Sequence, residues 1–431
     1  MNLWPIAMCF RRVLHQCVCP LPKRPGSRLS AYLNSRHAAT GHFVDDQPGF
    51  SPKRAVLLTK MTRYEYEKKV CGAKTDNELK KYLDSKRSDF QGLLERHRSH
   101  HNCVENIKKC LLSQDIETKV VERFHASPEV LEWADVVFTA GGDGTFLLGA
   151  SKVNSRDKPV IGINTDPDKS EGHLCLPKGD YSAMKFTAAL DRLLKGDFRW
   201  RWRQRIRITV SGQHANDDPI ELHDQQLQFP EHRFSEEVKE LETFQPRRDY
   251  LTVQPPRVLP VRALNEVFIG ESLSSRVSYY ELTVDEGSGQ KQKSSGITVC
   301  TGTGSTSWSF HINHLSMEAV RQLLDIVRDT SKEALPMIND TTLEEVVTRF
   351  NNSLMYDPSD LKMAFTIRDP LINGVFQVST PRGFAKKIQV RSRMWDACLV
   401  VDGGSSFKFN DGAIATMEML EEDALRTVTF D

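Results

Sequence analysis

The sequence lacks several features that would assign the protein to a class at once. No apolar run approaches the roughly 20 residues that a helix needs to cross a bilayer, so we expect no membrane contact. The nine cysteines are scattered and contain no CxxC pair, which disfavours a disulfide framework and a cysteine-ligated zinc site. A formal net charge of +1 provides no general reason to expect nucleic acid as a partner.

Acidic residues are absent from the first 44 positions, where the basic residues Arg11, Arg12, Lys23, Arg24, Arg28 and Arg36 lie among Leu, Ser and Ala. Acid-free leaders of this composition are typical of organelle transit peptides. A secretory signal fits less well, because the arginine pair follows the short apolar segment. We interpret residues 1–50 as a disordered transit peptide, with a tail that carries no targeting signal as the alternative.

Residues 51–194 have the pattern of an α/β domain. The apolar run "KRAVLLTK" predicts a buried strand, and further strands are predicted at "ETKVVERF", "ADVVFTA" and "KPVIGINT", with helical segments between them. A glycine-rich turn follows the strand Val136–Ala140. This alternation predicts a parallel, Rossmann-like sheet, and ligands bind such sheets at the carboxyl ends of the strands.

The composition changes after residue 194. In "FRWRWRQRIRI" (198–208) apolar and arginine residues alternate strictly, which predicts one half-buried strand. The alternative, a basic and aromatic surface for nucleic acid, is disfavoured because rings and arginines fall on opposite faces. The arginine face could instead meet an anionic ligand or a partner subunit.

The remaining strand-like runs predict a β-rich, sandwich-like domain over residues 195–410. A polar insertion at 212–257 interrupts it, and we expect this segment to be a mobile surface excursion. A helix is predicted around "MEAVRQLLDIVRD", with an apolar stripe formed by Val320, Leu323, Leu324 and Val327. The last strands, 411–431, could return to the first domain.

The segment "TAGGDGTFLLGAS", from Thr139 to Ser151, combines a glycine-rich turn with an acid. Such turns usually approach phosphates through backbone N–H groups at a helix N-terminus, yet the carboxylate of Asp143 would repel a phosphate. Asp143 could bind a metal, could accept a proton from a group that attacks a phosphate, or could simply cap the following helix.

Two further segments place polar residues where a strand pattern does not need them. Asn265 and Glu266 begin the strand-like "LNEVFIGE", although neither favours strands. The run "CTGTGST", ending at Thr306, forms a loop of small residues with many hydroxyl and N–H groups that suit phosphate and sugar oxygens. An edge position and an ordinary turn are the simpler alternatives.

Two other patterns carry weaker signals. The histidines of "HRSHH", His97, His100 and His101, could ligate a metal, but they lie in a polar stretch that we expect to be solvated. We therefore expect no metal ion to be held by side chains. Asp402-Gly403 and Asp411-Gly412 are typical of hairpin turns, and we assign them no chemistry.

The ordered series GGDG, LNE and Gly-Ser-Thr loop resembles the signature of the NAD kinases. The longer segments "NTDPDKSEGHLCLP", "RALNEVFIGESLSSRVSYYE" and "VVDGGSSFKFNDGAIA" are similar to the mitochondrial branch of that family in animals, over roughly residues 53–431. GGDG alone also occurs in diacylglycerol and sphingosine kinases and in some phosphofructokinases. The fold implied is that shared by NAD kinases and diacylglycerol kinases.

The resemblance implies a reaction in which the γ-phosphoryl group of ATP passes to the 2′-hydroxyl of the adenosine ribose of NAD, giving NADP. Asp143 would accept the hydroxyl proton and orient the oxygen for in-line attack, while Mg²⁺ carried by ATP offsets the phosphate charge. The family also implies a homo-oligomer, with a homodimer favoured, and a location in the mitochondrial matrix.

The same resemblance assigns ligand contacts, with Asn265 near the adenine. His311 belongs to the loop that borders the ribose and nicotinamide halves. The NAD contacts implied are Gly142, Gly144, Thr145, Asn265, Glu266, Thr306, Ser307 and Trp308. The ATP phosphate contacts implied are Gly141, Thr303, Gly304 and Ser305.

Departures from the family pattern keep two rival functions open. Ser295 replaces an aspartate before the third motif, Gly302 replaces a proline within it, and His173 replaces a phenylalanine after the fourth strand. A GGDG lipid kinase would not explain the LNE and Gly-Ser-Thr segments. A catalytically idle NAD(P)-binding sensor would have no need of the base Asp143.

Overall fold

The computed structural model describes residues 49–179, 181, 183–228, 255–330, 339–372 and 380–430. These residues belong to one compact unit that spans Pro48–Asp431. The expected transit peptide, residues 1–50, lies outside the described residues except for its last two positions. No helix in the described ranges is both long enough and apolar enough to cross a membrane.

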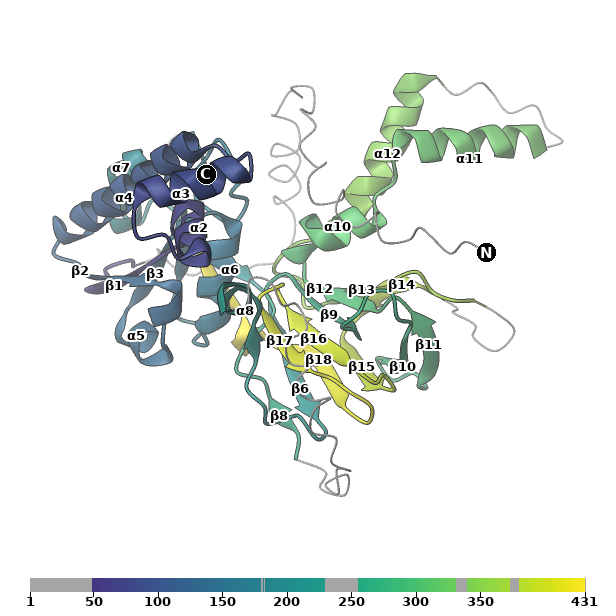
Figure 1. Cartoon of the computed structure of the whole chain (residues 1–431). Helices are drawn as coiled ribbons and strands as arrows, with labels where there is room; N and C mark the ends of the chain where they lie inside the picture. The colour runs from purple at the N-terminus through teal and green to yellow at the C-terminus, as the bar shows by residue number, and fades with distance from the viewer. Residues whose placement is uncertain are drawn as a thin grey trace. The chain divides into compact units, whose positions relative to one another are not determined.

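A four-stranded parallel sheet forms the first layer of the unit (Figure 1). Its strands, in spatial order, are β2 (Glu117–Glu122), β1 (Arg54–Thr59), β3 (Val136–Gly141) and β4 (Val160–Asn164). Because side chains alternate along a strand, Ala55 and Leu57 of β1 contribute to one core cluster and Val56 and Leu58 to another. The sheet is therefore buried on both faces, as the continuous apolar runs predict.

Helices cover the two faces of this sheet. The helices α4 (Phe90–Leu112) and α7 (Phe186–Leu194) share one core cluster with it, and α5 (Pro128–Trp133) and α6 (Asp143–Lys152) contribute to the other. The helices α2 (Arg63–Cys71) and α3 (Asp76–Ser85) pack against α4. The expected Rossmann-like α/β arrangement is confirmed.

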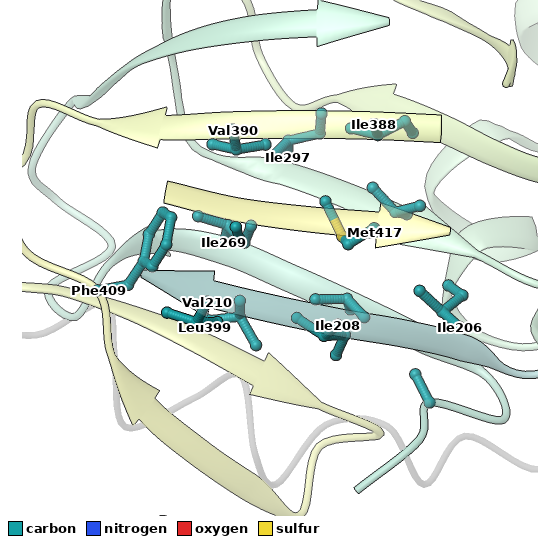
Figure 2. Packing of buried hydrophobic residues seen from close by; sticks show 14 of the residues in the cluster. Ile206, Ile208, Val210, Ile269, Ile297, Ile388, Val390, Leu399, Phe409 and Met417 are labelled. Carbon is teal, nitrogen blue, oxygen red and sulfur yellow. The ribbon is translucent and has the colours of Figure 1, made fainter. Parts of the chain in front are cut away.

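Antiparallel sheets of six and seven strands form the second part. Residues of both sheets meet in one apolar cluster, where Ile206, Ile208 and Val210 lie near Ile269 and Leu399 (Figure 2). This packing confirms the expected β-rich, sandwich-like architecture. The six-stranded sheet contains β11 (Gln290–Ser294), β10 (Ser278–Val284), β15 (Lys387–Ser392), β18 (Ile414–Met419), β6 (Ile206–Ser211) and β8 (Arg257–Val258). The seven-stranded sheet contains β14 (Arg382–Ala385), β13 (Met363–Ile367), β12 (Ile297–Cys300), β9 (Glu266–Glu271), β16 (Ala397–Val401), β17 (Ser405–Lys408) and β7 (Ile220–Glu221).

The prediction of a single strand over residues 198–208 is wrong. The structure divides it into β5 (Arg199–Arg203), which pairs with the C-terminal strand β19 (Leu425–Thr429), and β6 of the six-stranded sheet. The break occurs where the backbone N–H of Gln204 donates to Pro358 O at 2.8 Å. The adjacent Arg205 is fully buried, so the arginine face is not uniformly a solvent face.

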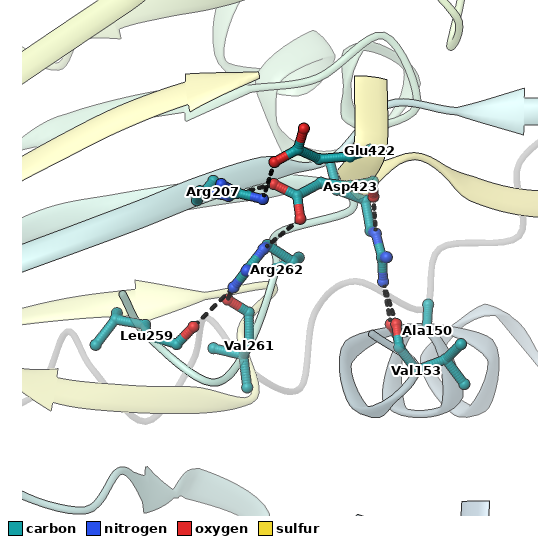
Figure 3. Close-up of polar contacts among 9 residues, drawn as sticks. Ala150, Val153, Arg207, Leu259, Val261, Arg262, Glu422 and Asp423 are labelled. Carbon is teal, nitrogen blue, oxygen red and sulfur yellow. Dashed lines mark hydrogen bonds and ion pairs between the residues drawn. The ribbon is translucent and has the colours of Figure 1, made fainter. Parts of the chain in front are cut away.

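Arg205 joins the α/β part of the unit to the β-rich part. Its Nη1 donates to Ala150 O and Val153 O at the end of α6, at 2.9 and 2.6 Å, and its Nε donates to Asp423 O at 2.6 Å. The carboxylate of Asp423 also holds Arg207 and Arg262 (Figure 3). Nearby, Leu425 of β19 lies in the core of the parallel sheet. The helix that begins at Asp143 is thus tied at its other end to the β-rich part.

The apolar stripe predicted on α11 (Met317–Thr330) is only partly buried. Val320 is buried against α12 (Asp340–Ser353), and Leu324 packs against the same small cluster. Leu323 and Val327, however, are 56% and 50% exposed. The two helices form their own small core away from the sandwich, so α11 has too few neighbours to cover its whole stripe.

Candidate active site

The GGDG turn joins β3 to α6. β3 ends at Gly141, and Gly142 is the N-cap residue of α6. A Cβ on Gly141 would lie 2.1 Å from Thr145 Oγ1, and one on Gly142 would lie 2.5 Å from Ser170 Oγ. Close packing therefore requires these two glycines, whereas a Cβ on Gly144 would meet no atom within 4 Å and faces open space.

Asp143 does not simply cap its own helix. Its Oδ1 accepts a hydrogen bond from the backbone N–H of Leu174 at 2.8 Å, and its Oδ2 accepts one from His173 N–H at 3.1 Å. Each carboxylate oxygen keeps lone pairs for a further contact. The segment after β4 thus fixes the orientation of this carboxylate, and His173 contributes through its backbone. Burial, reinforced by the Asp143 charge, raises the pKa of the neighbouring Cys175 thiol to about 12.

The LNE segment and the Gly-Ser-Thr loop form one structure. The N–H of Thr301 donates to Asn265 O at 2.9 Å, and its hydroxyl donates to Leu264 O at 2.5 Å. A Cβ on Gly304 would lie 2.1 Å from Asn265 O, so glycine is required where the loop crosses the segment. Leu264 itself packs in the core of the parallel sheet. This packing positions Asn265 and Glu266 beside the α/β part of the unit.

Asp402 orients the LNE segment and was missed by the sequence analysis. Its carboxylate accepts hydrogen bonds from the backbone N–H groups of Leu264, Asn265 and Glu266 at 2.8, 2.8 and 3.0 Å. Burial raises the pKa of Asp402 to about 6, although these three donors and the Arg205 charge act in the opposite direction. In the sequence, Asp402 is marked only by the Asp-Gly pair that is typical of a hairpin turn. Asp411 has the same pair, so this pattern could not single out Asp402 as a positioning residue.

Two buried polar atoms of the LNE segment have no hydrogen-bond partner among the described residues. They are Asn265 Oδ1 and Glu266 Oε2. Burial, together with the Asp402 charge, raises the pKa of Glu266 to about 8. Glu266 therefore holds a proton at neutral pH and can donate as well as accept a hydrogen bond. Unsatisfied buried polar atoms are costly, so this pair indicates a place for a ligand with hydroxyl and amine groups.

Arg203 lies between the first and third motifs. Its Nη1 donates to Thr303 Oγ1 at 3.3 Å, and its buried Nε has no hydrogen-bond partner in the part of the chain that the structure describes. Burial lowers its pKa to about 9, helped by Arg201 and opposed by the charges of Asp143 and Asp357. The guanidinium remains a cation at neutral pH, and it brings a buried positive charge close to the GGDG carboxylate.

The other predicted residues of the third motif have different environments. The Ser305 hydroxyl donates to Gly302 O and accepts from Tyr356 N–H, so it stabilises the loop itself. Thr306 is exposed, and Ser307 begins α10 (Trp308–Asn313). The Trp308 ring lies 5.7 Å from the ring of Phe268, and the Arg368 guanidinium lies 5.2 Å from its centroid. The side chain of Trp308 is 38% exposed.

A cavity of about 400 Å³ opens beside the GGDG turn. Cationic side chains share its wall with the glycines of the turn. Its lining residues are Lys60, Met61, Arg63, Tyr66, Arg123, Gly142, Gly144, Thr145, Leu148, His223, Asp224, Gln226 and Leu227. Only the three residues of the turn could be identified from the sequence, because Lys60, Arg63 and Arg123 belong to no motif.

Part of the polar insertion reaches this cavity. Its first third contains β7, which pairs with β17, and α8 (Leu222–Gln228). Arg123 holds this segment through Glu221 at 3.4 Å and Asp224 at 3.2 Å. Residues 220–228 of the insertion thus form a strand and a helix beside the cavity. Residues 229–254 lie outside the described part of the chain, and the mobility of the insertion stays a prediction.

The histidine run is not uniformly solvated, contrary to the expectation. His100 is 1% exposed and bridges Thr59 Oγ1 at 2.8 Å and Thr165 Oγ1 at 3.0 Å. Burial, with the nearby Lys60 charge, lowers its pKa to about 3. The neutral imidazole therefore connects the ends of β1 and β4, while His97 and His101 contact Glu65 of α2.

Comparisons with known proteins agree with this arrangement. Residues 65–198 match the family model of the ATP-NAD kinase N-terminal domain. Over 412 residues the chain is 46% identical to "NAD kinase 2, mitochondrial" of Rattus norvegicus, with 95% of each chain covered. The chain belongs to the NAD kinase family. Over 385 residues it is 49% identical to the human NAD kinase of the same description, covering 89% of this chain and 85% of that one.

The predictions of family, fold class and kinase activity class are thereby confirmed. Among solved structures, an NAD kinase from Archaeoglobus fulgidus in complex with ATP is similar over 88% of this chain and 93% of that chain, with 17% identity and a TM-score of 0.44. That likeness is too distant to bear on individual site residues. Their assignment depends on the geometry of this NAD kinase itself.

Proposed function

We propose that the chain transfers the γ-phosphoryl group of ATP to the 2′-hydroxyl of the adenosine ribose of NAD, forming NADP. The observation that carries this proposal is an oriented carboxylate in the GGDG turn beside a cavity lined by cationic side chains. The LNE segment adds two buried polar atoms that have no hydrogen-bond partner among the described residues. We also propose that the reaction occurs in the mitochondrial matrix, which fits the acid-free leader and the names of the relatives. The homodimer stays a prediction.

Asp143 is proposed as the general base. The two N–H groups that hold its carboxylate leave one lone pair on each oxygen to accept the ribose hydroxyl proton. Holding the oxygen atom in line with the phosphorus is the main task of a phosphoryl-transfer site. The carboxylate therefore acts on the acceptor, and the open space over Gly144 allows the ribose to approach it.

The LNE segment is proposed to hold the adenosine half of NAD. Asn265 Oδ1 can accept from an amine, and the protonated Glu266 can donate to a ring nitrogen or a hydroxyl group. The exposed part of the Trp308 ring offers a stacking surface. Gly142, Thr145, Thr306 and Ser307 remain predicted contacts on either side of this segment.

The cavity beside the GGDG turn is proposed to receive the phosphates of Mg²⁺-bound ATP. Lys60, Arg63 and Arg123 would complement their negative charge. Gly141, Thr303, Gly304 and Ser305 remain predicted phosphate contacts. Among these, the Thr303 and Ser305 hydroxyls contact Arg203 and the loop backbone.

The proposal is tested with Mg²⁺, ATP and either NAD or NADH, with NADP and NADPH measured separately. Asp143→Asn should lower the turnover number by about 10²–10⁴-fold and leave the NAD dissociation constant nearly unchanged. Asp157→Asn, at an exposed turn, is the matched control and should behave as wild type. NAD binding lost in parallel with rate would contradict the base assignment. If the wild type binds NAD but forms no product, the sensor is favoured. If the wild type shows no NAD binding and forms no product, a lipid kinase is favoured.

A further inference from the structure

Three potential metal ligands that do not line the proposed ATP cavity meet where α2 packs on α4. Glu65 comes from the first turn of α2, and His97 and His101 come from α4, four residues apart and therefore on one helix face. One ligand atom from each residue lies within 4.8 Å of the others. Glu65 Oε1 lies 3.0 Å from His101 Nε2 and 3.9 Å from His97 Nδ1.

Neighbouring contacts orient two of these side chains. Glu65 Oε2 accepts hydrogen bonds from the backbone N–H of Thr62 at 2.7 Å and from its hydroxyl at 2.8 Å, which leaves Oε1 directed at the histidines. The His97 ring stacks on the ring of Tyr64, with centroids 4.6 Å apart. Supporting contacts of this kind hold the ligands of a metal ion in place.

We propose that Glu65, His97 and His101 bind one divalent transition-metal ion, with Zn²⁺ as the best match. Two imidazole nitrogens and one carboxylate oxygen form a ligand set that suits Zn²⁺, and water can complete the tetrahedron. Zinc–ligand bonds of about 2.0–2.1 Å place tetrahedral ligand atoms about 3.3 Å apart. The two distances from Glu65 Oε1, 3.0 and 3.9 Å, bracket that separation. Binding would replace the present contact between His97 Nδ1 and Thr62 Oγ1.

The proposed ion would crosslink α2 to α4 next to the ATP cavity. Arg63 and Tyr66, on either side of Glu65 in α2, line that cavity. The ion would therefore stabilise the helix that carries these two side chains without contacting either substrate. The sequence analysis considered the histidines of one run together, but His100 points into the core and the third ligand lies on another helix.

The test uses the full chain, freed of metal with a chelator and titrated with Zn²⁺ against a chromogenic competitor. We expect one Zn²⁺ per chain, bound at least about 10-fold more weakly by His97→Gln and by His101→Gln. His125→Gln, at an exposed histidine outside the cluster, is the matched control and should bind as wild type. Equal affinity in wild type and both cluster variants would overturn the proposal.

A second variant separates metal binding from folding. Glu65→Gln keeps a side chain that can complete the capping box with Thr62 but removes the carboxylate ligand. Zn²⁺ should raise the Tm of wild type, because a ligand that binds only the folded state stabilises it, and should raise it less in Glu65→Gln. Co²⁺ should give the absorption of a tetrahedral site in wild type alone. The same Tm rise in both proteins, or an octahedral Co²⁺ spectrum, would contradict the assignment.

Discussion

Asp402 and Asp411 precede glycines in turns that look alike in the sequence, yet the structure gives them different roles. Asp402 binds three consecutive backbone N–H groups of the LNE segment. Asp411 is exposed, and its Oδ1 lies 3.8 Å from Arg393 Nη1 in an ion pair. Long-range side-chain contacts with backbone N–H groups thus distinguish a positioning residue from an ordinary turn residue.

Replacing Asp402 with asparagine should weaken NAD binding more than it slows turnover. The amide has a single acceptor oxygen and a donor that faces the same N–H groups, so the segment carrying Asn265 and Glu266 loses its support. We expect the KM for NAD to rise about 10-fold, corresponding to about 1.4 kcal/mol, with a smaller change in kcat. Steady-state kinetics with varied NAD measures both constants. Asp411→Asn should leave them unchanged, and a similar effect in both variants would argue against the positioning role.

At the scale of elements, α8 shows how an insertion contributes to a site. Its charged first turn is held by Arg123, which follows β2 of the parallel sheet. The side chain of Arg123 is only 16% exposed. Its ion pairs are therefore better shielded from solvent than ion pairs between exposed side chains. The cavity wall therefore depends on a contact between residues about a hundred positions apart.

The variant Arg123→Ala should impair the use of ATP selectively. It removes one cavity cation and releases α8 from the cavity wall, so we expect the KM for ATP to rise about 10-fold or more while the KM for NAD changes little. Initial rates with each substrate varied in turn provide the two values. Arg349→Ala, which removes an exposed pair with Glu345 on α12, should have no effect. An equal rise in both KM values would indicate a general structural defect instead.

On the scale of the whole molecule, the two layers are joined through buried polar contacts as well as through apolar cores. Arg205 binds carbonyl groups of α6 and of residue 423, and Asp423 in turn binds Arg207 and Arg262 (Figure 3). Burial lowers the pKa of Arg205 to about 10, so it stays charged at neutral pH. Its charge is balanced by peptide dipoles and by the nearby acids.

Arg205→Met should destabilise the protein strongly. Methionine fills part of the volume but leaves three buried carbonyl groups without a donor, at about 1–3 kcal/mol for each unsatisfied group. We expect a loss of at least about 3 kcal/mol and a clearly lower Tm, measured by denaturant and thermal unfolding. Arg391→Met, at an exposed strand position, is the control. A near-wild-type Tm for Arg205→Met would show that the peptide carbonyls find other donors.

Local patterns in the sequence determined the α/β class, the β-rich second part and the identity of the three motifs. Apolar runs, turn residues and helix caps act over a few positions, so they can be recognised without a structure. The GGDG turn after β3 and the polar start of β9 are examples. The division at Gln204 was not predictable, because it depends on a hydrogen bond to Pro358.

Only the tertiary structure decided which groups act on those motifs. Asp143 is oriented by residues 30 and 31 positions away, and the LNE segment by an aspartate up to 138 positions away. The cavity cations, the role of α8 and the Glu65–His97–His101 cluster likewise arise from elements that are distant in sequence. Contacts of this length leave no periodic or local signal, since any polar residue at a strand end could have met a different partner.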